Sequence, residues 1–188
     1  MEIENAQIQR RRILLQGVIQ GVGLRPFVYR EAKQNGLSGL VLNNSTGVKI
    51  EVEGIPQKIE DFIRSLQDSP PVLARIDEIV VEPIPPQGDK EFIIETSQQG
   101  EEQQVMISPD TATCSECLQE LFDPNDRRYH YPFINCTNCG PRFSIVQDAP
   151  YDRSKTTMAS FIMCSACAAE YSNPLDRRFH AQPIACLR

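Results

Sequence analysis

The sequence predicts an α+β domain, with two helices on one face of an antiparallel sheet, followed by a small metal-binding domain. Residues 10–97 alternate between β-prone runs and amphipathic stretches, as strands and helices that share one core do. All seven cysteines come after residue 113. Residues 98–106 are polar and aperiodic, which is typical of a linker. We therefore expect two domains, at 8–98 and 107–188.

The first domain is expected to contain a strand, a helix, two strands, a second helix and a fourth strand, with one further edge strand. The segments that carry these patterns are, in chain order, residues 13–19, 26–36, 40–42, 48–52, 55–66, 76–81 and 92–94. The order βαββαβ is that of the split βαβ, or ferredoxin-like, fold.

The helix and turn boundaries follow from local chemistry. Pro26 suits a first helical turn and Gly36 a helix end, with apolar residues on one face between them. Asn44-Ser45-Thr46-Gly47 is a hairpin turn pattern, and the next strand alternates apolar and polar residues. In the second helix apolar residues recur at helical spacing until Pro70-Pro71 ends it.

A glycine-rich loop, Gly17 to Arg25, joins the first strand to the first helix. Glycines let the backbone curl so that several N–H groups face one hollow, and the helix N-terminus that follows favours an anion. Arg25 can donate to two phosphate oxygens at once. Because glycines are common in loops, a plain structural turn stays open as the alternative on this pattern alone.

Two motifs in this region resemble those of the acylphosphatase family. Gln20-Gly21-Val22-x-x-Arg25 is similar to the family's first motif, and Gly39-Leu40-Val41-Leu42-Asn43 to its second. The family's fold is the ferredoxin-like one. The chain departs from the usual pattern at three positions, where packing is affected more than chemistry: Ile19 and Leu24, in place of Val and Phe, and Leu40, in place of an aromatic residue.

The resemblance implies a phosphate-binding loop and two catalytic residues. Arg25 would bind and stabilise the phosphoryl group, and the Asn43 carboxamide would orient the attacking water. The phosphate-binding residues would be Gln20, Gly21, Val22, Gly23, Leu24 and Arg25. Phosphoryl transfer needs positioning and charge stabilisation more than a covalent group.

The cysteines favour zinc over disulfides, because their number is odd and six of them form C-x-x-C pairs. Cys114-x-x-Cys117 and Cys136-x-x-Cys139, eighteen residues apart, would close a four-thiolate site, which is structural rather than catalytic. A redox C-x-x-C is the weaker alternative.

A repeat with a period of fifty residues covers this region and supplies Cys164, Cys167 and Cys186 to a second site. The chain ends at Arg188, one position before the expected fourth cysteine, so we expect an incomplete site in a truncated repeat. His180 is an alternative ligand. Its counterpart His130 lies in a repeat that already has four cysteines, so both histidines are predicted to pack or hydrogen-bond.

The repeats also carry paired arginines, Arg127-Arg128 and Arg177-Arg178, which we expect to form solvated surface salt bridges. The net charge is −6, and neither half has the basic excess that nucleic-acid binding requires. The sequence has no apolar run typical of a membrane span or signal peptide, which predicts a cytoplasmic protein without a membrane partner.

From about Arg10 to Arg188, the chain resembles the N-terminal portion of the HypF family of carbamoyltransferases, which act in [NiFe]-hydrogenase maturation. Segments 25–29 and 179–183 add to the motifs above. The resemblance implies hydrolysis of carbamoyl phosphate or another acyl phosphate. The carbamate would form carbamoyl adenylate, with ATP and Mg²⁺ in domains absent from this chain, for transfer to HypE in cyanide-ligand synthesis. A non-catalytic zinc-finger scaffold and a nucleic-acid-binding protein remain alternatives.

Overall fold

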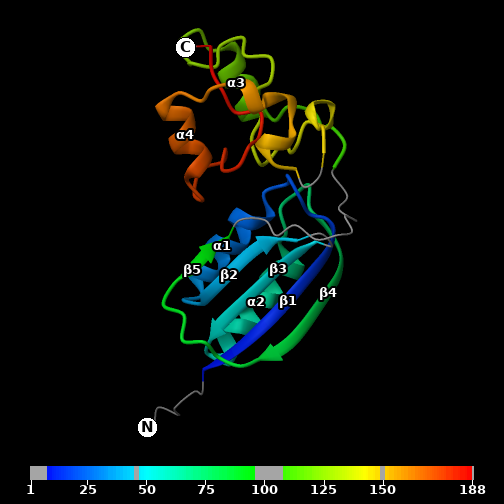
Figure 1. Ribbon diagram of the computed structural model, residues 1–188, viewed down its shortest axis with the longest axis vertical. Coiled ribbons are helices and arrows are strands. Elements are labelled where there is room, and N and C mark those ends of the chain that lie inside the picture. The colour runs from blue at the N-terminus through cyan, green and yellow to red at the C-terminus, as the bar shows by residue number, and fades with distance from the viewer. Residues whose placement is uncertain (1–7, 45–46, 96–107, 149–150, 188) are drawn as a thin grey trace.

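The computed structural model describes residues 8–44, 47–95, 108–148 and 151–187. A five-stranded sheet with two helices forms the N-terminal half, and the cysteine-rich half lies against one end of it (Figure 1). The expected linker, residues 98–106, and the centre of the expected hairpin turn, residues 45–46, lie outside the described residues. No helix of the described segments is long and apolar enough to cross a membrane.

The N-terminal half has the expected βαββαβ order plus an edge strand. Its elements are β1 (Gln9–Val18), α1 (Leu24–Gln34), β2 (Ser38–Asn43), β3 (Val48–Gly54), α2 (Pro56–Asp68), β4 (Arg75–Ile84) and β5 (Phe92–Ile94). The strand order is β4-β1-β3-β2-β5, in which only the β2–β5 pair is parallel. The predicted ferredoxin-like fold is confirmed.

One apolar core joins the sheet to its two helices. Alternate residues of β1, such as Ile13 and Leu15, are buried, because successive strand side chains point to opposite faces. They pack with Ile50 of β3, Phe62 of α2 and Val28 of α1 in a single cluster. This core holds the C-terminal ends of β1 and β2 beside the start of α1, where the glycine-rich loop lies (Figure 1).

The cysteine-rich half repeats one local structure. The helices α3 (Ser115–Phe122) and α4 (Ser165–Ser172) each begin directly after the first cysteine of a C-x-x-C pair. In each repeat a histidine, His130 or His180, has the left-handed backbone conformation, with φ of 55° and 52°. Their backbone N–H groups donate to Leu121 and Tyr171 at 2.9 Å and 3.0 Å. The fifty-residue period in the sequence therefore corresponds to a structural unit.

The prediction that the paired arginines form solvated surface salt bridges is wrong. Arg127 and Arg128 of the first repeat both pair with Glu170 on α4. Arg177 and Arg178 of the second repeat pair with Glu120 on α3, and Arg128 and Arg178 are each only 3% exposed. The repeats face one another and exchange arginines, so these pairs lie between the repeats, with Arg128 and Arg178 buried and their partners partly buried.

The two halves meet at the glycine-rich loop. A Cβ atom on Gly21 would lie 3.0 Å from Pro141 and 3.1 Å from Tyr151, and one on Gly23 would lie 3.0 Å from Thr137. Both glycines have positive φ, 75° and 78°, which other residues adopt at a cost. Glycine at these two positions therefore lets the loop turn sharply and lie in close contact with the cysteine-rich half.

Candidate functional site

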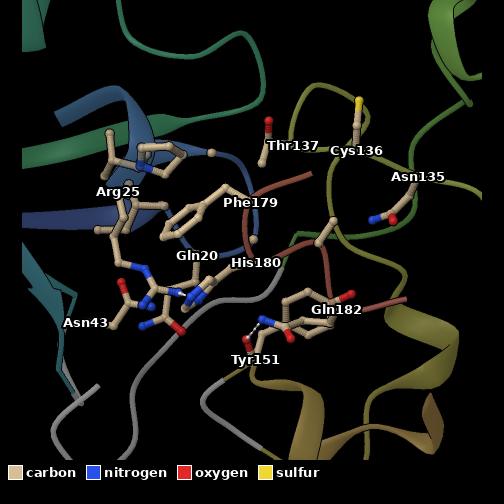
Figure 2. A pocket seen from close by; sticks show the side chains of 16 residues that line it. Gln20, Arg25, Asn43, Asn135, Cys136, Thr137, Tyr151, Phe179, His180 and Gln182 are labelled. Atoms are coloured by element: carbon tan, nitrogen blue, oxygen red, sulfur yellow. Dashed lines mark hydrogen bonds between the residues drawn. The ribbon is translucent and has the colours of Figure 1, made fainter. Parts of the chain in front are cut away.

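The loop, the end of β2 and residues of both cysteine repeats line one small cavity of about 30 Å³ (Figure 2). Such a volume is far below the several hundred Å³ of a typical cofactor pocket and suits a small anion or water. The N-terminal half contributes loop residues and Asn43. The polar side chains from the cysteine-rich half are Asn135, Thr137, Tyr151, His180 and Gln182.

Arg25 and Asn43, the two predicted catalytic residues, line the same cavity. They come from different elements, the first turn of α1 and the last residue of β2. β3 pairs with β2 up to Asn43 and so fixes where that strand ends. Figure 2 shows their side chains together with those of Gln20 and His180 at one end of the cavity.

The Arg25 side chain is only partly exposed, and its guanidinium lies inside the cavity without a carboxylate partner among the described residues. Its side chain makes one hydrogen bond, from Nη2 to Nδ1 of His180 at 3.3 Å. Burial lowers the pKa of Arg25, and the nearby charge of Asp152 opposes this effect. An uncompensated buried guanidinium is unfavourable unless a negative group approaches it. An anion in the cavity would compensate this charge.

Two carboxamides at the cavity have unused hydrogen-bonding capacity. Gln20 is 1% exposed and Asn43 3% exposed. Neither side-chain polar atom of Gln20, nor Oδ1 of Asn43, has a hydrogen-bond partner within the described chain. Buried polar atoms are nearly always paired, so an unpaired group in a cavity indicates a ligand or ordered water. Gln20 can donate to an anion, and Asn43 Oδ1 can accept from a water molecule.

The loop backbone adds further donors. Across the described segments, the N–H groups of Val22, Gly23 and Leu24 donate to no protein acceptor. They precede or begin α1, where unpaired amides and the helix dipole together attract negative charge. Of these residues Gly23 and Leu24 line the cavity together with Arg25, so their amides are candidate donors to an anion there.

The sequence did not foresee that the cysteine-rich half contributes to this cavity. The sequence predicts that His180 packs or hydrogen-bonds, with zinc ligation as the alternative, and Gln182 enters only through the segment 179–183 that adds to the family resemblance. Asn135, Thr137 and Tyr151 carry no prediction. Burial, followed by the charge of Arg25, lowers the pKa of His180 to about 4. The histidine is therefore neutral near pH 7 and accepts the Arg25 hydrogen bond. No local motif marks such residues, because the contact joins segments 155 positions apart.

The first four cysteines fit a zinc ion. Their Sγ atoms lie 3.6 Å apart for Cys114 and Cys136, 3.9 Å for Cys136 and Cys139, and 4.0 Å for Cys139 and Cys117. Four sulfurs held tetrahedrally at the usual zinc–sulfur distance would be about 3.8 Å apart. Arg177 of the other repeat donates to Cys117 Sγ at 3.1 Å, which balances part of the thiolate charge.

The second cluster contains three cysteines. Cys164, Cys167 and Cys186 have sulfur atoms within 4.8 Å of one another, and those of Cys164 and Cys186 are 3.6 Å apart. Arg128 donates to Cys167 Sγ at 3.6 Å, repeating the arginine contact of the first site. His180 is not part of either cluster found among the described residues, because its Nδ1 faces Arg25.

Two family profiles match the chain in separate regions. Residues 11–94 match the acylphosphatase family. Residues 113–146 and 163–188 match the HypF finger, so both cysteine repeats belong to that type of finger.

Relatives of two sizes are similar to this chain. The probable carbamoyltransferase HypF of Methanocaldococcus jannaschii is 50% identical over 76% of this chain, which corresponds to 19% of that protein. An acylphosphatase of Yersinia pseudotuberculosis is 37% identical over 42% of this chain and 86% of its own length. The chain thus spans nearly a whole acylphosphatase and about a fifth of the longer relative.

A solved structure matches almost the whole chain. A crystal structure of full-length HypF in a phosphate- and nucleotide-bound form superposes with a TM-score of 0.91 at 53% identity. The match covers 99% of this chain and 25% of that protein. The arrangement of the acylphosphatase-like half against the fingers is therefore similar to that of the corresponding quarter of that structure.

Proposed function

Because this chain belongs to the acylphosphatase family and corresponds to the acylphosphatase and finger region of the carbamoyltransferase HypF, we propose that it hydrolyses a small acyl phosphate, with carbamoyl phosphate as the substrate. The observation that carries this proposal is the Arg25 guanidinium, which lies in the cavity without a carboxylate partner among the described residues, beside the unpaired carboxamides of Gln20 and Asn43. A phosphoryl group would supply the missing acceptors.

The proposed reaction is an in-line attack of water on phosphorus. Arg25, the loop amides and Gln20 hold the phosphoryl oxygens and stabilise charge in the transition state. Asn43 Oδ1 accepts a hydrogen bond from the water and aims its oxygen. The new bond joins water oxygen to phosphorus while the bond from phosphorus to the acyl oxygen breaks, giving carbamate and phosphate. The proton of the water passes to solvent.

No strong base is required of the protein. The titratable groups that line the cavity are Arg25, Cys136, Tyr151 and His180, and none is a carboxylate. Carbamate, which leaves from phosphorus, is a good leaving group, so positioning and electrostatic stabilisation are the main contributions available to this site. This fits a pocket whose polar side chains are mostly amides and one guanidinium.

The proposal also covers the division of this chain into domains and its place in a longer protein like the HypF relatives. We propose two domains, 8–98 and 107–188, with structural Zn²⁺ in the second, in a cytoplasmic protein. The carbamate would be used with ATP and Mg²⁺ by regions that this chain does not span, and the carbamoyl group transferred to HypE. Support comes from the similarity to HypF proteins named as carbamoyltransferases.

Replacing Arg25 tests the site directly. We expect Arg25→Ala to lower the rate of phosphate release from carbamoyl phosphate or acetyl phosphate by about 10²- to 10³-fold, because one essential donor to the transition state is lost. Arg64→Ala is a matched control. Arg64 is an exposed α2 residue whose ion pair with Asp61 is on the surface, so its removal should leave the rate unchanged.

Full activity of Arg25→Ala would show that the site is wrong, and absence of turnover in the unaltered chain would favour the scaffold function. Circular dichroism of both variants checks that each is folded. Asn43→Ala should also lose activity but keep phosphate affinity within a few-fold, because Asn43 is assigned to water rather than to the phosphoryl group.

A further inference from the structure

Arg25 reaches the cavity on a long, flexible side chain that needs a partner to hold its orientation. The partner that the structure provides is His180, through the 3.3 Å contact between Nη2 and Nδ1. An arginine can only donate, so Nδ1 of His180 must carry a lone pair and the ring proton must be on Nε2. The contact is therefore a hydrogen bond to a neutral ring.

A neutral acceptor has a clear advantage at this position. A carboxylate would orient Arg25 equally well, but it would also neutralise the guanidinium and compete with the phosphoryl oxygens. His180 orients the group while leaving its positive charge available. Within the described residues, the other four N–H donors of the guanidinium have no protein acceptor and can donate to a ligand.

His180 is itself held firmly by the second cysteine repeat. Its ring is stacked on Tyr171, with centroids 4.9 Å apart and planes 5° apart, and on Phe179 at 4.2 Å. Its backbone N–H donates to the Tyr171 carbonyl at 3.0 Å. Tyr171 lies in the last turn of α4, which begins directly after Cys164. The folding of this repeat therefore determines where the imidazole points.

The first repeat provides an internal comparison. His130 has the same left-handed backbone and the same type of backbone hydrogen bond, and its ring stacks on Tyr129 with centroids 3.8 Å apart. Unlike His180 it is exposed, and it is not part of the cavity. The fold of a repeat therefore accounts for the histidine's backbone, and the contact with Arg25 belongs to the second repeat alone.

We propose that His180 is a positioning residue for the phosphate site: it holds Arg25 toward the cavity, so that the second cysteine repeat forms part of the phosphate-binding machinery. This inference rests on the proposed function. The fingers then do more than act as a scaffold, because their folding fixes the orientation of the Arg25 side chain. Arg25 therefore loses less side-chain entropy when phosphate binds.

The test measures binding of inorganic phosphate to the whole chain by ³¹P NMR titration, which reaches weak affinities. His180→Ala should raise the dissociation constant about tenfold, the usual effect of one hydrogen bond to a charged group. His180→Asn should stay within about twofold of the unaltered chain, because asparagine tolerates positive φ and offers an oxygen near the position of Nδ1. His130→Ala has the same backbone strain and should leave phosphate binding unchanged.

A double-mutant cycle separates positioning from a general structural role. In an Arg25→Ala background, His180→Ala should cause no further loss of phosphate affinity, since its only proposed effect is on that arginine. Zinc content, measured by mass spectrometry, should be the same in all variants.

Three outcomes decide the matter. An unchanged affinity in His180→Ala, or an equal loss with and without Arg25, would overturn the positioning role. A phosphate affinity that does not respond to Arg25→Ala would instead overturn the proposed function.

Discussion

At the scale of single residues, the partners of an arginine determine whether its charge is neutralised within the protein or is available to a ligand. Arg10 shows the contrasting case of an arginine with carboxylate partners: it contacts Glu51, Glu53 and Asp89 at 2.9 Å, 3.0 Å and 2.6 Å. Those contacts satisfy Arg10 and make it structural. Arg25 has a neutral histidine instead, so its charge is left for a ligand. The same residue type therefore stabilises the fold at one place and, in the proposed function, binds an anion at another.

The buried state of His180 predicts a loss of stability in mild acid. Burial and the charge of Arg25 lower the pKa of His180 from 6.5 to about 4. Between these values the unfolded chain binds a proton at His180 that the folded chain does not, so the contribution of His180 to stability falls as the pH decreases from 6.5 to about 4. Below about pH 4 this contribution stays constant. Tyr171 and Asp152 are the other titratable groups near this pair.

The measurement is the unfolding midpoint in urea of the unaltered chain and of His180→Asn between pH 7 and pH 4. The unaltered chain should lose more stability than the variant over this range. Parallel pH profiles for the two proteins would contradict a depressed pKa at His180.

At the scale of elements, α3 and α4 each supply one glutamate to the arginines of the opposite repeat. Glu120 on α3 contacts Arg177 and Arg178, and Glu170 on α4 contacts Arg127 and Arg128. Burial acts to raise the pKa of Glu120, but the hydrogen bond from Arg178 and the charges of both arginines outweigh it and lower the pKa. Each helix therefore neutralises arginines that in turn contact cysteine sulfur atoms.

Removal of one of these carboxylates should loosen the cysteine-rich half. We expect Glu120→Gln to reduce its free energy of unfolding by about 1–3 kcal/mol, because the buried Arg178 loses its charged partner. Glu116→Gln is the matched control on the same helix, because the Glu116 side chain is 60% exposed and lies 4.0 Å from Arg177. Its effect should be close to zero. Thermal unfolding followed by zinc release measures both variants, and equal effects would show that burial of the pair is unimportant.

At the scale of the whole molecule, the two halves have separate apolar cores and contact one another at the glycine-rich loop. The sheet and its helices form one cluster, and the cysteine repeats form two others that include the cysteines of the two candidate zinc sites. Metal binding contributes to folding mainly in the small units with little apolar core of their own. The N-terminal half should therefore stay folded without zinc, whereas the part of the cysteine-rich half that lines the cavity should not.

Chelation tests this division. Removal of zinc should increase hydrogen exchange in residues 108–187 and in the loop residues 20–24, which lose their contacts with Thr137 and Tyr151. Backbone amides of β1 and β3, in the centre of the sheet, should stay protected. Phosphate affinity should fall as well, because the cysteine-rich half would no longer line the cavity. If chelation unfolded both halves at once, two independent cores would be the wrong description.

The sequence by itself determined the local parts of this protein. The order of strands and helices, the curled glycine loop and the C-x-x-C pairs all depend on residues close together in the chain, where periodicity and ligand spacing are visible. The candidate roles of Arg25 and Asn43 came from motifs of the same kind.

Only the tertiary structure decided which groups surround them. His180 meets Arg25, and Glu120 meets Arg178, across 155 and 58 positions, because the two halves and the two repeats pack together. Such contacts depend on how separate cores are placed in space, and no local pattern encodes that placement.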